Sequence, residues 1–301
     1  MFIFGLLGAA INLCCTIFFY RKFSEFTSYA IMSFVYLLAN TLLLFIYALW
    51  GAITSYFELY DLADSRVGLI VGGVFWYFWY VSIYVDAFLA INRLCSLCFP
   101  TFYFRTFTSK NTIRTLIGFC IYNIWHFVLS QFDTCHVFYN PRNYQWMYDE
   151  EYVCGRLYAR YDFYMTLALN GSALLLDSIT LYHIYQRYEE LRSQKVPSMH
   201  NHPHNVINSR DLRFFMQSLI TTLIYMLQVL MYYVIAHYDL VDQHRILLKF
   251  YLGSFSWMMC PFLAGVTYFL LTTQLRKKLF RTLFGSWKVA DNNVTLVVQV
   301  R

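Results

Sequence analysis

The chain contains few charged residues. Asp, Glu, Lys and Arg make up only 13% of its 301 residues, whereas about a quarter of a typical soluble domain is charged. Hydrophobic residues make up 59% of the chain and aromatic residues 21%. A soluble fold could bury such a core, but too few charges would remain to cover its surface. The composition therefore excludes an ordinary soluble protein and indicates a membrane protein built from helices.

Charge is missing over whole segments that are long enough to cross a bilayer, which takes a helix of about 20 mostly apolar residues. Five segments contain no charged residue, and two more contain a single acid each. In chain order the seven are residues 1–20, 26–57, 67–92, 115–132, 163–186, 214–238 and 250–275. We therefore expect an all-α bundle of seven transmembrane spans.

The apolar start of the chain lacks the features of a cleavable signal peptide. It has no basic segment before the apolar run and no convincing small-residue cleavage site, and Arg21 and Lys22 follow it directly. We expect residues 1–20 to be the first span.

Basic residues are unevenly divided between the two sets of connecting segments. Of the 23 Lys and Arg residues, 17 fall after the first, third and fifth spans and in the tail, and 6 fall in the alternate loops. Because basic residues accumulate on the cytoplasmic side, we expect the amino terminus outside. The net charge of +6 then reflects topology and attraction to the anionic inner leaflet, and no nucleic-acid partner is needed to explain it.

Two elements are expected after the last span. Residues 276–281 combine four basic residues with Leu279 and Phe280, a pattern that predicts a short amphipathic helix on the inner leaflet. We expect residues 1–284 to form one membrane domain and residues 285–301 to be a disordered cytoplasmic tail.

The most informative motif is Asn92-Arg93 at the inner end of the third span, followed by Pro100. An arginine beside hydrocarbon marks a membrane boundary with a function. In a seven-span chain this motif resembles the G-protein-coupled receptors, and the chain is most similar to the nematode serpentine chemoreceptors of class x (srx). The matching stretches are Ala90–Leu94 with Phe99-Pro100, Cys135–Tyr139 through Trp146 to Cys154, Leu176–Thr180 and Arg213–Gln217.

The resemblance covers about residues 5–284. It implies a chemosensory receptor without cofactor or enzymatic activity, which transmits the binding of a small molecule outside to a heterotrimeric G protein inside. It also implies a multi-pass protein of the plasma membrane, in the ciliary membrane of sensory neurons. Three features depart from rhodopsin-like receptors: Asn92 replaces an acid, the sixth span lacks both tryptophan and proline, and Cys260-Pro261 stands where Asn-Pro is usual.

Arg93 has two interpretations. In the first, which the resemblance favours, it holds the resting bundle through a hydrogen bond at the cytoplasmic end and meets the G protein when the sixth span moves outward. In the second, it is an anchor whose long side chain reaches the membrane surface. Asn92 cannot form the usual adjacent ion pair, and Asp177 is a candidate partner. Asn92, Arg93, Pro100 and Asp177 form the predicted coupling switch.

A polar network is predicted inside the bundle. Asp86 lies seven residues before Arg93 and therefore on nearly the same helix face, and intramembrane carboxyl groups normally face a partner in the bundle. We expect Asn12, Asn40, Asp86 and Pro261 to contribute to this network, with Asn40 beside Asp86. A protonated Asp86 with a purely structural hydrogen bond is the alternative.

The expected outer loop between the fourth and fifth spans contains two cysteines, Cys135 and Cys154. In an oxidising compartment we expect them to form a disulfide, which would contribute about 3 kcal/mol in the chain-entropy model. Residues 58–67 contain no cysteine, so the common receptor bridge to the third span is excluded, and the loop would instead be shaped into a lid. No second cysteine pair lies near Cys95 and Cys98, and no metal site is expected.

The ligand is expected between the outer halves of the third, fifth, sixth and seventh spans, in an aromatic site with few polar groups. The candidate contacts are Trp76, Trp79, Tyr80, Asn170, Tyr225, Gln228, Tyr232 and Trp257. None of them is an acid or a base, which favours a neutral or apolar ligand.

The main alternative function is a transporter or a ligand-gated channel. Transporters tend to have internal repeats and interrupted helices, but no repeat is visible here and Pro261 is the only proline within a span. An enzyme is not expected, because the chain has no H-E-x-x-H or G-x-S-x-G motif. A retinal protein is not expected either, since the seventh span has no interior lysine.

Overall fold

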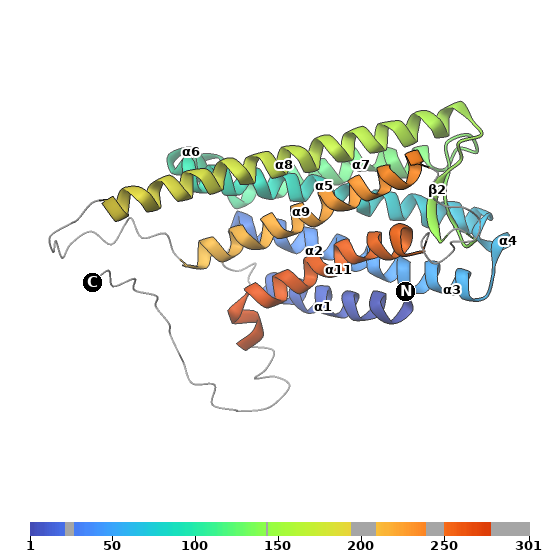
Figure 1. The fold of residues 1–301 in the computed structure, drawn as a ribbon, viewed down its shortest axis with the longest axis horizontal. Helices are drawn as coiled ribbons and strands as arrows, with labels where there is room; N and C mark the ends of the chain where they lie inside the picture. Colours follow the sequence, from blue (N-terminus) through green and yellow to red (C-terminus); the bar gives the residue numbers. More distant parts are fainter. Residues whose placement is uncertain (22–26, 143, 194–208, 239–249, 278–301) are drawn as a thin grey trace.

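Seven long helices lie alongside one another in the computed structural model, which describes residues 1–21, 27–142, 144–193, 209–238 and 250–277 (Figure 1). Two short helices and one β-hairpin connect them. The long helices are α1 (Phe2–Arg21), α2 (Ser28–Ile46, continued by η2 Tyr47–Gly51 and α3 Ala52–Tyr56), α5 (Arg66–Cys98), α7 (Ser109–Leu129), α8 (Val153–Ser193), α9 (Ser209–Tyr238) and α11 (Ser256–Leu271, preceded by η4 Tyr251–Phe255). The short elements are α4 (Tyr60–Ala63), α6 (Pro100–Thr106), β1 (Val137–Asn140) and β2 (Gln145–Tyr148).

Side-chain caps set the start of several helices. Thr27 accepts a hydrogen bond from the Ala30 amide at the start of α2, and Thr108 accepts one from the Asn111 amide at the start of α7. Each cap satisfies an amide that has no partner within the helix. Pro100 occupies the first turn of α6, where the missing N–H is not needed. The helix α5 therefore ends at Cys98, five residues after Arg93, and a new helix begins at Pro100.

Five helical segments are long and apolar enough to cross a membrane by length and composition: 2–21, 28–56, 66–98, 109–129 and 253–271. In α9 a shorter stretch, Leu219–Met231, is apolar. Several helices extend beyond their predicted spans. The helix of the third span, α5, continues past Asn92 to Cys98, and α8 begins at Val153, ten residues before the predicted start of the fifth span. Hydropathy alone placed both boundaries too far inward, because polar residues extend these helices beyond their apolar centres.

The helix α5 lies at the centre of the bundle, packed against α2, α7 and α8. Its aromatic residues Phe75, Trp79 and Tyr80 are almost completely buried. On α7 the usual soluble pattern is inverted. The exposed face carries apolar side chains at helical spacing, among them Ile117 and Ile121, whereas the buried side contains Asn123 and His126. This inversion is what a helix needs if its outer face contacts lipid.

The β-hairpin covers one end of the bundle, which we call the hairpin end; the opposite end, where α5 and α8 terminate, we call the Arg93 end (Figure 1). Side chains alternate along the hairpin, so that Val137 and Tyr139 of β1 and Trp146 and Tyr148 of β2 are buried. Tyr139 pairs with Trp146, and Val137 with Tyr148. Since alternate side chains share a face of a strand, the hairpin turns one apolar, aromatic face onto the helices.

Two predictions fall largely or wholly outside the described residues. Only the first two residues of the predicted amphipathic helix 276–281 are described, as the end of a short helical stretch at 273–277. The predicted tail, residues 285–301, lies wholly outside.

Candidate functional site

A disulfide and a close backbone approach hold the hairpin against the bundle. Cys135 and Cys154 are bonded, with their Cα atoms 5.1 Å apart. Both cysteines were expected in a loop, but Cys154 lies in the first turn of α8, so the bridge ties the base of the hairpin to a helix. On α5, a Cβ atom at Gly72 would collide with the Val137 carbonyl oxygen. Glycine at this position lets β1 lie directly on the helix.

The tip and edges of the hairpin are bound to other elements. The Tyr139 hydroxyl lies 2.9 Å from Ser55 Oγ, the Ser254 hydroxyl donates to the Tyr144 carbonyl oxygen, and the Arg142 guanidinium lies 4.8 Å from the centre of the Tyr60 ring. Burial raises the pKa of Tyr139 to about 12. The hairpin is thus a fixed cover and not a free loop.

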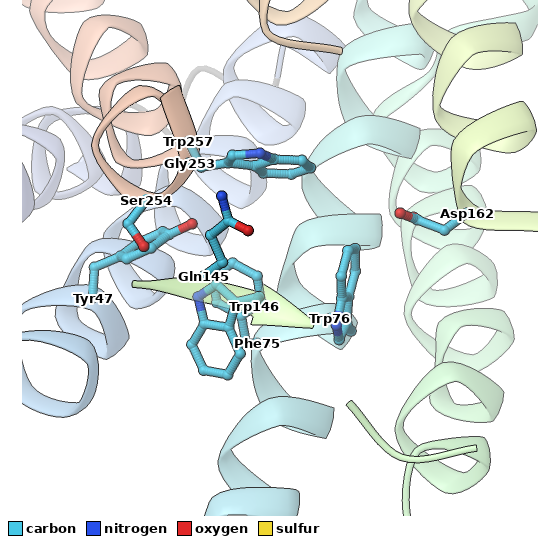
Figure 2. Close-up of a pocket in the computed structure, with 9 residues that line it drawn as sticks. All are labelled: Tyr47, Phe75, Trp76, Gln145, Trp146, Asp162, Gly253, Ser254 and Trp257. Atoms are coloured by element: carbon cyan, nitrogen blue, oxygen red, sulfur yellow. The ribbon is translucent and has the colours of Figure 1, made fainter. Parts of the chain in front are cut away.

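A pocket lies directly beneath this cover (Figure 2). Together with its open mouth, which is continuous with solvent, it encloses about 390 Å³. Its walls come from η2, α5, β2, α8, η4 and the first turn of α11. The lining residues are Tyr47, Phe75, Trp76, Gln145, Trp146, Asp162, Gly253, Ser254 and Trp257.

Aromatic rings form most of the pocket wall. The rings of Phe75 and Trp146 are stacked with centroids 4.2 Å apart, and Tyr47 meets the Phe75 ring edge-on at 5.3 Å. On the other side, the rings of Trp76 and Trp257 are nearly perpendicular, with centroids 6.4 Å apart. The pocket therefore presents both ring faces and ring edges to a ligand.

Asp162 is the one carboxyl group that lines the pocket. It is 7% exposed, and in Figure 2 its carboxylate points from α8 toward Trp76 and Trp257. The Tyr80 hydroxyl donates to Asp162 Oδ1 at 2.6 Å, and Thr166 Oγ1 donates to the same oxygen at 3.4 Å. Asp162 was not among the residues named from the sequence, none of which is an acid or a base. The neutral or apolar ligand expected from those residues stays a prediction.

Of the seven predicted ligand contacts whose side chains the structure describes, only Trp76 and Trp257 line the pocket. Trp79 lies behind them, 4.4 Å from the Trp257 ring, and Tyr80 reaches the pocket only through Asp162. The other four of the eight predicted contacts are Asn170, Tyr225, Gln228 and Tyr232.

Three of these four have other partners, and one is not described. Asn170 donates to the Thr166 carbonyl oxygen of its own helix, and Tyr225 belongs to a network deeper in the bundle. In the amide orientation that satisfies both groups, Gln228 accepts from Trp257 Nε1 at 2.9 Å and so positions that indole. The side chain of Tyr232 lies outside the described part of the structure.

Beneath the pocket, Asn40 connects three helices. Its Oδ1 accepts from Ser82 Oγ at 3.1 Å and from the Tyr225 hydroxyl at 3.2 Å. Asp86 lies one turn along α5 from Ser82 and accepts from Thr222 of α9 at 3.4 Å. No direct Asn40–Asp86 hydrogen bond is present among the described residues. Asn40 and Asp86 nevertheless belong to one region, because Ser82 and Asp86 lie one turn apart on α5, and Thr222 and Tyr225 lie one turn apart on α9.

Asn12 and Pro261 form a separate contact between α1 and α11. Asn12 Nδ2 donates to the Pro261 carbonyl oxygen at 3.0 Å and to the Gly8 carbonyl oxygen at 2.9 Å. The predicted interior network is thus two groups of residues. One joins α2, α5 and α9, and the other joins the first and last helices.

At the Arg93 end, Arg93 of α5 and Asp177 of α8 form a buried ion pair. Arg93 Nε donates to Asp177 Oδ1 at 3.0 Å, and Nη2 donates to Oδ2 at 3.2 Å. Both side chains are almost completely buried, so Arg93 does not extend to the surface as an anchor would. Among the described residues, Arg93 Nη1 and Asn92 Nδ2 are buried without a hydrogen-bond partner. Pro100 lies beyond this cluster, at the exposed start of α6.

Seven pocket residues were not among the sequence candidates: Tyr47, Phe75, Gln145, Trp146, Asp162, Gly253 and Ser254. One sequence signal was available, the aromatic residues at the alternate positions Trp146 and Tyr148, a pattern typical of a strand with one buried face. The other positions have no such signal, since they meet only when the helices pack. Within the described residues, no group of three or more His, Cys, Asp or Glu side chains could hold a metal ion.

Comparison with known families gives the identity of this fold. A family model described as serpentine type 7TM GPCR chemoreceptor Srx matches residues 2–271. No curated protein matches the chain. The family match confirms the resemblance expected from the sequence and the expected all-α, seven-transmembrane bundle, and it describes a family of membrane-embedded receptors, not of enzymes. Because the match covers most of the chain, the protein belongs to the serpentine seven-transmembrane chemoreceptor family Srx.

Proposed function

We propose that the protein is a chemosensory G-protein-coupled receptor that binds a small molecule in the pocket beneath the hairpin and activates a heterotrimeric G protein at the Arg93 end. In this proposal the amino terminus and the hairpin face the outside of the cell. The receptor resides in the plasma membrane, specifically in the ciliary membrane of sensory neurons. The uneven distribution of basic residues supports this orientation.

The observation that carries the proposal is that the same two helices contribute to both ends. On α5, Trp76 lines the pocket and Arg93 forms the ion pair; on α8, Asp162 lines the pocket and Asp177 is the partner. At a rise of 1.5 Å per residue, the two positions on α5 are about 26 Å apart and those on α8 about 22 Å apart. A ligand that contacts both helices at one end can therefore change their relative position at the other.

The buried ion pair would act as the switch. A charge left in the bundle without its partner is strongly destabilising, so the Arg93–Asp177 contact favours the arrangement seen here. A ligand shifts this equilibrium only if it binds the alternative arrangement more tightly. Separation of α5 from α8 would expose the guanidinium, with Asn92 beside it, to a cytoplasmic partner.

The test is to express the full chain in a heterologous cell and to record G-protein activation while a panel of odorants and small metabolites is applied. We expect a ligand-evoked response that is lost in Arg93→Ala at equal surface expression. Arg156→Ala is the matched control, because Arg156 is an exposed arginine at the hairpin end whose bonds go to backbone oxygens.

A transporter or channel remains the alternative function. Ligand-evoked current that persists when G proteins are blocked, or a response unchanged in Arg93→Ala, would contradict the receptor proposal.

A further inference from the structure

Asp162 is a buried acid without a cationic partner. Within the described residues, the ion pairs are those of Arg93 with Asp177 and of His136 with Asp149, and neither involves Asp162. The imidazole of His126 stacks on Tyr80, the hydrogen-bond donor to Asp162, but His126 Nδ1 is bonded to the Tyr158 hydroxyl and not to Asp162. A carboxylate is costly to bury unless it is paired and hydrogen-bonded. The Asp162 carboxylate is therefore a buried hydrogen-bond acceptor whose negative charge is not balanced by a cationic side chain among the described residues.

The hydrogen bonds to Asp162 hold its carboxylate in position but leave part of its acceptor capacity unused. Tyr80 and Thr166 both donate to Oδ1, and Tyr148 of the hairpin is a further electrostatic neighbour. An ionised carboxylate can accept about four hydrogen bonds, so capacity for another donor remains. All of these neighbours are hydroxyl groups, which orient the carboxylate but cannot neutralise it.

The rest of the pocket has the chemistry of a cation site. Indole and phenol rings attract a cation over their faces, tryptophan most strongly. Here Trp76, Trp257 and Tyr47 line the same pocket as the carboxylate, and Figure 2 shows Asp162 facing the two indoles. A neutral ligand could donate a hydrogen bond to the carboxylate but would leave its charge unbalanced.

We infer that the pocket binds a protonated amine or a quaternary ammonium group, whose charge meets the Asp162 carboxylate and whose carbon atoms lie against the tryptophan rings. This inference rests on the proposed function and names the chemical class of its ligand.

The experiment uses the purified full-length chain in lipid nanodiscs and needs no G protein. The probes are choline and phenethylamine, each compared with a neutral analogue of similar shape, dimethylbutanol for choline and phenethyl alcohol for phenethylamine. Binding is measured as the rise in melting temperature up to millimolar concentration. The variants are Asp162→Asn, whose amide oxygen still accepts from Tyr80, and the control Asp133→Asn, which removes an exposed acid before the hairpin.

At least one amine is expected to raise the melting temperature of the wild-type chain and of Asp133→Asn. Its neutral analogue is expected to raise the melting temperature much less. Apparent affinity for the amine should fall roughly tenfold or more in Asp162→Asn, the loss of one charge-assisted bond. Equal binding of amine and neutral analogue, unchanged amine binding in Asp162→Asn, or no binding of either amine would overturn the inference. The comparison on the wild-type chain gives an answer even if a variant does not fold.

A separate measurement of nucleotide exchange on a G protein distinguishes this inference from the proposed function. Amine binding without exchange would support the amine site and contradict G-protein coupling. Exchange driven only by neutral ligands would support coupling and overturn the amine site.

Discussion

Arg93 Nε and Nη2 donate to the two carboxylate oxygens of Asp177, at 3.0 and 3.2 Å, in a buried two-point contact between α5 and α8. The planar guanidinium matches a carboxylate in this side-on geometry, which lysine cannot reproduce. The contact therefore fixes the relative position of two helices as well as pairing two charges. Several consequences of this packing can be measured.

Asp177→Ala should destabilise the receptor by about 3–5 kcal/mol, because it leaves the buried Arg93 charge without a partner. The loss should appear as a lower melting temperature of the purified protein. Arg93→Met combined with Asp177→Leu should recover most of that stability, since neither charge then remains. If the single and double variants are equally destabilised, the pair does not stabilise the bundle in the way we describe.

A milder variant at Asp177 separates stability from signalling. Asp177→Asn keeps the shape of the side chain but weakens its hold on Arg93, so we expect higher G-protein activation without ligand than in the wild-type chain. Basal activity should be compared at equal surface expression. Basal activity no higher than in the wild-type chain would argue that the ion pair is structural only.

The disulfide should stabilise the fold by about 3 kcal/mol in the chain-entropy model, given the 19-residue separation of its cysteines. Cys135→Ser, Cys154→Ser and the double variant should all lose the same amount in thermal unfolding, and a reductant should have no further effect on them. As a control, Cys14→Ser removes a free cysteine at the α1 surface and should change stability little. Unequal losses would show that one cysteine has a second role.

Gly72→Ala should displace the hairpin, because the added Cβ would collide with the Val137 carbonyl oxygen. We expect a loss of about 1–3 kcal/mol, as for other overpacked sites, together with weaker binding in the pocket. Gly118→Ala is the matched control: it lies in α7 with nothing within 4 Å of its Cβ position. There the helix preference for alanine should raise stability by up to about 1 kcal/mol.

Asp86→Asn tests the interior network. The variant retains an oxygen that can accept from Thr222, so it should reach the cell surface normally. If the charge of Asp86 takes part in switching, the ligand response should change at equal expression. Normal signalling together with full expression would leave Asp86 a purely structural group.

The fold followed from the sequence because each span carries its own signal. A charge-free run of about 20 residues predicts a helix in a bilayer wherever it lies in the chain. The ends of the helices were predicted less well, because hydropathy does not detect helical turns of polar residues beyond the apolar centre of a span. Val153 and Cys98, as the ends of α8 and α5, appear only in the structure.

The ligand contacts predicted from the sequence and the residues that line the pocket are mainly aromatic, but only Trp76 and Trp257 belong to both sets. Trp76 and Trp257 were identifiable as aromatic residues near the outer ends of spans. Tyr47 and Trp146 were not, because one lies where α2 passes into a π-helical turn and the other on a strand that lies over the bundle. No local pattern tells which of many aromatic residues in such a chain face a common cavity.

By itself, the sequence determined the number of spans, the family and the two cysteines of the hairpin, because composition, motif order and spacing are local properties. Only the tertiary structure decided that Asp177 meets Arg93 and that Asp162 enters an aromatic pocket. These residues lie 84 and 86 positions from Arg93 and Trp76 in the chain. Their pairing depends on how α8 is rotated and shifted against α5, which packing across the whole bundle sets and no segment encodes alone.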